Sequence, residues 1–178
     1  MSFHFIGYFP KKIERATSAM GLPGVSEIWS VSNCISKPPE GWIQHWRHND
    51  FGFFDTPPLA GSVVPTNLVQ EFRVVGYRIW SEPFGEGPRL AAISGPTNLR
   101  PSADFVVIGY DAVSSNHGQD FECSPLSCNG AAKEFAATSQ CLFASLDDAM
   151  AAGRTFAAGN WEPGPYYIVE VLASSGPA

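Results

Sequence analysis

The chain lacks the short motifs that mark the commonest enzyme classes. Its 178 residues contain no Walker loop, no Gly-x-Gly-x-x-Gly, no Gly-x-Ser-x-Gly and no His-Glu-x-x-His. Each of these motifs encodes a physical device, namely a phosphate cradle, an exposed nucleophile or a pair of zinc ligands. Their absence argues against nucleotide-dependent, α/β-hydrolase and zinc-protease chemistry.

Charge is scarce as well, and positive charge most of all. Charged residues make up 16% of the chain, and its net charge is -6. Nucleic acids and anionic membranes bind cationic surfaces, so neither is predicted as a partner. No apolar run approaches the roughly 20 residues that cross a bilayer. The N-terminal segment lacks the basic and apolar pattern of a secretory signal, which predicts a cytoplasmic protein.

Cysteine is rare and irregularly spaced. A chain of this length buries a core without disulfides, so we expect Cys34, Cys123, Cys128 and Cys141 to be reduced. A zinc site built from the last three and His117 is disfavoured, because structural zinc motifs usually pair ligands about two to four residues apart in tight turns. No metal and no cofactor is therefore predicted.

The clearest structural pattern lies in residues 103–174. An apolar, β-branched run predicts a strand over 103–113, and a second strand is predicted over 166–172. Between them, Ser145 and Asp148 have the spacing of a helix capping box. Apolar residues then recur on one face of a helix as far as Ala158, before Gly159.

Further strands are predicted over residues 2–9, 27–32 and 71–80, with a helix over 36–49. The strands are not separated by regular helices, which excludes a doubly wound parallel sheet. The sequence therefore predicts a single α+β domain over residues 1–174, followed by a frayed tail over 175–178. Its sheet is expected to be mixed but largely antiparallel, with about five strands and two or three helices packed on it.

The most suggestive segment for chemistry contains Cys128. If residues 131–138 form a helix capped by Asn129, its positive end would lower the pKa of the Cys128 thiol and favour a nucleophilic thiolate. His117 would then act as the base, oriented by Asp111 or Asp120. The structural alternative is a small buried cysteine in a turn, with a solvated histidine in the preceding loop.

A second candidate site combines aromatic and imidazole side chains. On the predicted helix over 36–49, Trp42 and Trp46 lie one turn apart, while His45 and His48 share another face. With Phe53 they form a predicted ligand-binding or partner-binding surface, although the aromatic rings would equally suit an edge of the core. The two histidines have the spacing of metal ligands but no evident third ligand.

Two carboxylates interrupt apolar strands. If the strands of Asp111 and Glu170 are neighbours, both groups could face one cleft as an acid–base pair. The structural alternative places each at a strand end or on an exposed face, with Tyr110 in the core.

These features lead to two principal functional hypotheses. The acidic charge and the missing motifs favour a non-enzymatic interaction module, such as an antitoxin-like protein that binds a cationic protein partner. The alternative is a cysteine-dependent hydrolase or acyl transferase that uses Cys128 with His117. A third possibility is binding of a small ligand by Trp42 and Trp46. The sequence does not predict an oligomeric state.

Overall fold

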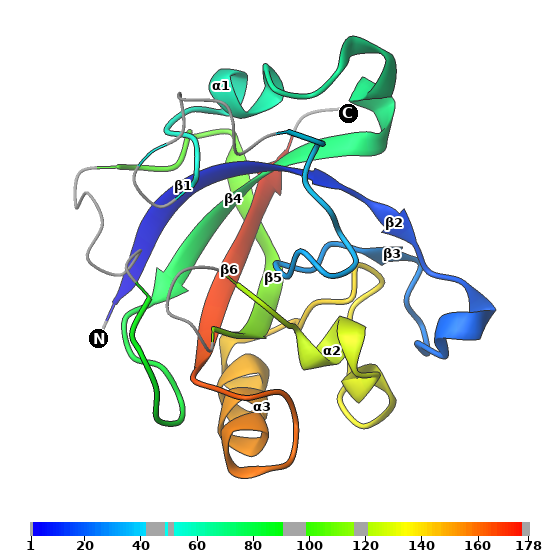
Figure 1. Ribbon diagram of the computed structural model, residues 1–178, viewed down its shortest axis with the longest axis vertical. Coiled ribbons are helices and arrows are strands. Elements are labelled where there is room, and N and C mark those ends of the chain that lie inside the picture. Colours follow the sequence, from blue (N-terminus) through cyan, green and yellow to red (C-terminus); the bar gives the residue numbers. More distant parts are fainter. Residues whose placement is uncertain (1, 42–48, 50–51, 91–98, 116–120, 176–178) are drawn as a thin grey trace.

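The computed structural model describes residues 2–41, 49, 52–90, 99–115 and 121–175 (Figure 1). Its main sheet has the strand order β1-β4-β6-β5, with each neighbouring pair antiparallel. The strands are β1 Phe3–Lys12, β4 Phe72–Trp80, β5 Phe105–Ser114 and β6 Tyr166–Ser174. A smaller sheet pairs β2, Glu14–Arg15, with β3, Glu27–Ile28. The predicted single-domain α+β fold is confirmed, with every pairing in the described sheets antiparallel rather than mixed.

Helices occupy a small part of the described chain. The α-helices are α1 Pro57–Gly61, α2 Pro125–Cys128 and α3 Leu146–Ala158. Short 3-10 helices cover Ser18–Met20, Thr66–Glu71 and Ala131–Lys133. No helix in the described part of the chain has both the length and the apolar character needed to cross a membrane.

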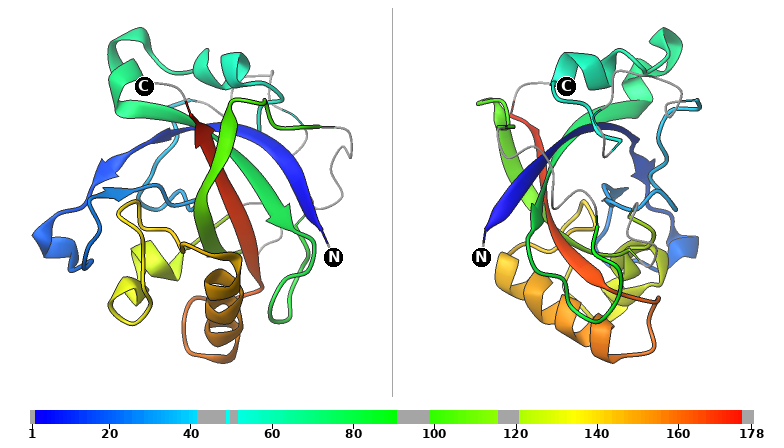
Figure 2. Two further views of the ribbon diagram at one scale, coloured as in Figure 1. Left: turned by 180° about the vertical axis from the view of Figure 1, so that it is seen from behind. Right: turned by 60° about the vertical axis from the view of Figure 1, so that its left-hand side comes forward.

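Helix α3 has the predicted bounds, but Gly159 after it is extended and does not form the expected left-handed cap. The Ser145 hydroxyl accepts a hydrogen bond from the Asp148 N–H at 3.2 Å and donates to the Asp148 carboxylate at 2.6 Å. The helix packs on β5 and β6 (Figure 2). Gly153 allows close contact, because a Cβ atom there would lie 2.8 Å from the Phe84 ring. The helix therefore covers one face of β5 and β6.

Strand β6 lies between β4 and β5 and forms the middle of the core. Its residues from Tyr166 to Leu172 are all buried. Ile168 packs in the cluster beneath α3, whereas Val169 packs in the cluster on the opposite face. Both faces of this strand are covered, which explains why its sequence is nearly continuous in apolar residues.

Within the described residues, three isolated β-bridges join loops to the main sheet, and two of them involve its outer strands. On the β1 side, Tyr8 and Phe54 exchange backbone hydrogen bonds of 2.7 and 2.8 Å. On the β5 side, Tyr110 and Phe143 exchange bonds of 3.0 and 2.8 Å. Each outer strand is thus joined to a loop near its middle.

The helix predicted over 36–49 is wrong in its first turn. Residues 36–41 are not helical, and residues 42–48 lie outside the described part of the chain. The Ser36 hydroxyl donates to the Ile28 carbonyl at 2.8 Å, so this segment is held by tertiary contacts instead of local ones. The Asn49 side chain donates to the Ile6 carbonyl at 3.1 Å.

The capping arrangement of α3 predicts the effect of Ser145→Ala. The substitution removes the acceptor of the Asp148 N–H and should lower the free energy of unfolding by about 1 kcal/mol. Urea denaturation followed by circular dichroism measures the change. Ser139→Ala, at an exposed serine outside the helices, is the control and should have little effect. Equal losses in both variants would contradict the capping role.

Candidate functional site

A buried lysine holds the segment that leads into the candidate site. Lys11 is 1% exposed. Its Nζ lies within hydrogen-bond distance of four oxygens, the carbonyls of Val31, Ser32 and Ser36, each at 2.9 Å, and Oδ1 of Asn33 at 2.7 Å. A buried ammonium is stable only when such acceptors replace its water. Residues 31–36 are therefore wrapped around one cation from β1.

A buried carboxylate holds the same segment from the other side. Asp111 of β5 is fully buried, and its two oxygens accept four hydrogen bonds. The donors are the Val31 N–H at 3.0 Å, the Ser30 hydroxyl at 3.4 Å, the Ser124 hydroxyl at 2.7 Å and the Ala112 N–H at 2.9 Å. Asp111 thus ties the segment beginning at Ser30 to the start of α2.

The carboxylate pair considered from the sequence does not form. Strands β5 and β6 are neighbours, but Asp111 lies opposite Val169, while Glu170 lies opposite Tyr110. Successive residues of a strand point to opposite faces, so the two carboxylates are on different sides of the sheet. The alternative of an exposed Asp111 is wrong as well. Glu170 pairs with Arg78 at 3.0 Å.

Cys123 and Cys128 lie at the two ends of a compact turn. The backbone of Cys123 pairs with Ser114, since the Ser114 N–H donates to the Cys123 carbonyl at 2.8 Å. Pro125 then begins α2, a position where its missing N–H is harmless. The Cys128 N–H donates to the Ser124 carbonyl at 2.8 Å and closes the turn. This geometry brings the two sulfurs together.

Several polar groups surround the Cys128 sulfur. The hydroxyls of Ser32 and Ser127 each lie 3.7 Å from it. The nearby Cys123 thiol donates a hydrogen bond to Oδ1 of Asn129 at 3.0 Å. Cys123 is buried, whereas Cys128 is partly exposed. The accessible sulfur therefore lies among hydrogen-bonding groups, beside a buried thiol.

These contacts separate the acidities of the two thiols. The neighbouring Cys123 thiol has the largest effect and lowers the pKa of Cys128, and the Ser124 backbone and the two serine hydroxyls act in the same direction, against the effect of burial. The interaction with Cys128, followed by burial, raises the pKa of Cys123. Cys128 is therefore the more acidic of the two thiols.

The other two cysteines differ from this pair. Cys34 is exposed, and its thiol donates to the Glu122 carbonyl at 3.1 Å. Cys141 is buried, and burial, with the nearby charges of Asp111 and Cys128, raises its pKa to about 12. All four cysteines are free. Among the described residues, no group of three or more His, Cys, Asp or Glu side chains is arranged to hold a metal ion.

The sequence identified Cys128 for a reason that the structure overturns. No helix forms over 131–138, where a 3-10 turn ends at Lys133, and Cys128 is the last residue of α2. The pKa of its thiol is lowered by side-chain and backbone donors, not by a following helix. A usable signal was present: the paired cysteines flank a Pro-initiated turn that also contains Ser124 and Ser127.

Most of the remaining predicted site residues lie outside the described part of the chain. His117 and Asp120 lie outside the described residues, as do Trp42, His45, Trp46 and His48. Phe53 is described and is 8% exposed. Its ring makes edge-on contacts with Phe9, Tyr77 and Phe121. Phe53 therefore belongs to the core, and the role proposed for the other four stays a prediction.

Comparisons with known proteins add no assignment. No protein-family model, no curated protein and no solved structure matches the chain. The site is therefore interpreted from its own geometry.

The environment of Lys11 predicts a large effect of Lys11→Met. This change keeps the length of the side chain but leaves buried oxygens without their donor, and each hydrogen bond to a charged group contributes about 1.5–3 kcal/mol. Unfolding free energy should fall by about 3 kcal/mol or more, as measured in urea. Lys12→Met is the matched control, because the ion pairs of Lys12 with Glu14 and Glu71 are on the surface and should contribute little. Similar losses in both would contradict the model of Lys11 as a buried anchor.

The buried carboxylate predicts a pH dependence of stability. Burial, the largest effect, raises the pKa of Asp111 to about 7, although its hydrogen bonds oppose the shift. Between pH of about 4 and about 7 the folded state keeps a proton that the unfolded state releases. This contribution to stability is therefore present at low pH and is lost as the pH rises. Asp111→Asn should remove this pH dependence of the unfolding free energy, as measured by urea titrations at several pH values. A stabilising contribution from Asp111 that grows with pH would contradict the prediction.

Proposed function

We propose that this protein performs thiol–disulfide exchange, with Cys128 as the attacking thiolate and Cys123 as the second thiol. One observation supports this above all: two neighbouring thiols, of which the accessible one lies among hydrogen-bonding groups and has a lowered pKa. The thiolate is the nucleophile in such reactions, and access decides which sulfur attacks first. The substrate would be a disulfide in a small molecule or on a protein surface.

The proposed reaction has two balanced steps. The Cys128 thiolate attacks one sulfur of the substrate disulfide, so a mixed disulfide forms and the other substrate sulfur leaves as a thiolate and takes up a proton. Cys123 then loses its proton to water and attacks Cys128 Sγ. The Cys123–Cys128 disulfide forms, and the second substrate thiol is released. The substrate gains two electrons, and the protein is oxidised by two.

The second thiol distinguishes exchange from the hydrolase hypothesis. A cysteine hydrolase or acyl transferase requires a base beside its nucleophile. Asp111, one of the two residues expected to orient His117 for that task, already accepts four hydrogen bonds from other residues. A hydrolase does not need a neighbouring cysteine, whereas exchange does. Hydrolysis by Cys128 with His117 remains a prediction with weaker support.

The interaction-module hypothesis also remains a prediction. It depends on the net charge of -6, which would favour a cationic protein partner. The thiol pair is a more specific feature than overall charge, so exchange is the preferred proposal. Free cysteines, including an exposed Cys34, support the further proposal that the protein works in the reducing cytoplasm.

A redox titration tests the exchange proposal. The full chain is equilibrated in glutathione buffers, quenched in acid, unfolded and alkylated, and its mass is measured. We expect one disulfide between Cys123 and Cys128, with Cys141 alkylated throughout. Chymotrypsin cleaves after Leu126 and separates the two cysteines, so a linked pair of fragments identifies the bond. Cys34→Ser is the control and should leave the midpoint potential unchanged.

Alkylation of the folded, reduced protein supplies the second readout. Iodoacetamide at neutral pH should modify Cys128 at least about tenfold faster than Cys141, because only a thiolate reacts. Cys123→Ala removes the thiol that lowers the pKa of Cys128 most, so it should slow the reaction of Cys128 with iodoacetamide. A disulfide that always includes Cys34 would refute the proposed pair. Fast alkylation of Cys128 that persists in Cys123→Ala, without disulfide formation, would favour the hydrolase hypothesis instead.

A further inference from the structure

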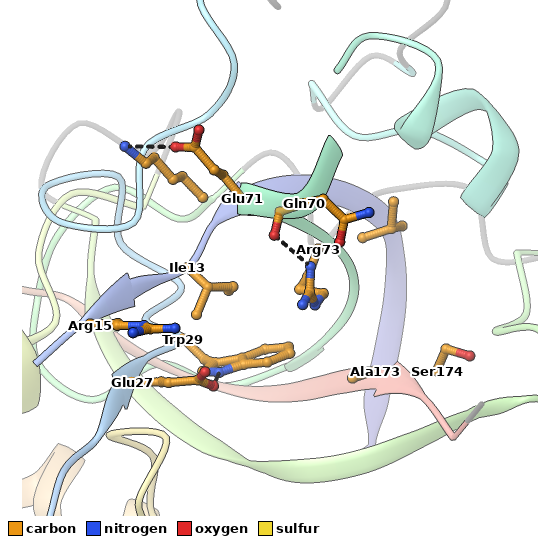
Figure 3. A pocket seen from close by; sticks show the side chains of 11 residues that line it. Ile13, Arg15, Glu27, Trp29, Gln70, Glu71, Arg73, Ala173 and Ser174 are labelled. Atoms are coloured by element: carbon orange, nitrogen blue, oxygen red, sulfur yellow. Dashed lines mark hydrogen bonds and ion pairs between the residues drawn. The ribbon is translucent and has the colours of Figure 1, made fainter. Parts of the chain in front are cut away.

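A separate cavity of about 550 Å³ lies where β1 continues into β2, beside the start of β4 and the end of β6 (Figure 3). It shares no lining residue with the thiol site. Its volume falls within the range of about 300–1,000 Å³ that small-molecule sites occupy. The lining residues are Lys12, Ile13, Arg15, Glu27, Trp29, Gln70, Glu71, Arg73, Val74, Ala173 and Ser174.

Positive charge is concentrated in this cavity, although the protein as a whole is acidic. Three of its lining residues are cationic, Lys12, Arg15 and Arg73. The Arg73 guanidinium is positioned by two backbone carbonyls, of Gln70 at 3.1 Å and of Phe72 at 2.9 Å. Within the described part of the chain, neither arginine forms an ion pair with a carboxylate. Both keep donors available for a ligand.

The two carboxylates of the cavity are already engaged. Glu27 accepts a hydrogen bond from the Trp29 indole at 2.9 Å, and Glu71 pairs with Lys12 at 3.3 Å. Three cations and two anions leave the lining with an excess of positive charge. An anionic ligand would therefore meet the two arginines and not a balanced set of ion pairs.

The rest of the lining is apolar except for Gln70 and Ser174. In Figure 3 the side chains of Ile13 and Arg73 point toward the indole of Trp29, which forms the lower wall, and Ala173 lies at one end. The hydrogen bond to Glu27 fixes the orientation of this indole. A fixed aromatic face beside aliphatic side chains suits a flat ring, because stacked rings bury area at little entropic cost.

We propose that this cavity binds a small molecule in which a planar ring carries an oxyanion group, either a carboxylate or a phosphate. The ring would pack on Trp29 and Ile13. The oxyanion would accept hydrogen bonds from Arg73 and Arg15, whose planar guanidinium groups match two oxygens at once. The site is independent of the thiol pair and does not require the proposed exchange activity.

Calorimetry with matched probes tests this site. The probes are 2-naphthoate, 2-naphthyl phosphate, the neutral isostere 2-naphthamide, and inorganic phosphate, each titrated into the full chain at low salt. At least one naphthyl anion should bind at least about tenfold more tightly than the amide, the factor expected from one charged hydrogen bond. The better of the two anions identifies the oxyanion as carboxylate or phosphate. Inorganic phosphate should bind more weakly, because it lacks the ring.

Variants locate the binding. Arg73→Gln and Arg15→Gln should each weaken binding of the naphthyl anion by at least about tenfold. Trp29→Leu should reduce the difference in affinity between the naphthyl anion and inorganic phosphate. Arg15 is exposed, so its variant remains informative if Arg73→Gln does not fold. Arg100→Gln, at an exposed arginine outside the cavity, is the control. Cys128→Ala should bind normally, which separates this site from the exchange proposal.

Two results would overturn the inference. One is the absence of binding by both naphthyl anions at dissociation constants below about 1 mM, the weak end of specific recognition. The other is binding that Arg15→Gln and Arg73→Gln leave unchanged, since it would then occur elsewhere on the protein.

Discussion

The ammonium of Lys11 organises an irregular segment that has little regular structure of its own. Beyond Ile28, residues 29–36 contain no strand or helix, so their backbone oxygens need partners from elsewhere. Lys11 supplies those partners from β1, and Asp111 supplies acceptors for the same segment from β5. Two opposite charges on separate strands thus position Ser32 beside Cys128. The candidate site depends on both strands as well as on its own turn.

The same segment links the two proposed sites. Trp29 lines the cavity, and Ser32 follows three residues later beside the Cys128 sulfur. Each site takes only one or two residues from the segment and the remainder from elsewhere, with Arg73 and Arg15 in one case and the Cys123–Cys128 turn in the other. A displacement of the segment would change the wall of the cavity and the environment of the thiolate together.

The sequence predicts well those features that local rules determine. The bounds of α3 follow from its capping residues and its apolar period, and β6 follows from a continuous apolar run. The candidate site is different, because its important contacts join distant residues. Asp111 is 80 residues from Val31 along the chain, and Cys128 is 96 residues from Ser32. A buried Lys11 among apolar neighbours has no distinctive local pattern either, since its acceptors come from a later loop. The missing first turn of the helix predicted over 36–49 has the same origin, as Ser36 is held by Lys11 and Ile28.

The isolated bridges on the two outer strands, β1 and β5, affect self-association at high protein concentration. An outer strand with free N–H and C=O groups is a template for pairing with another molecule. Phe54 occupies such groups at the middle of β1, where Pro10 also lacks a donor, and Phe143 does the same for β5. The beginning of β5 is less well protected, because Val106 and Val107 are 47% and 39% exposed there. Self-association through strand addition would therefore start at this end of β5. A charged side chain in place of either valine would oppose this pairing.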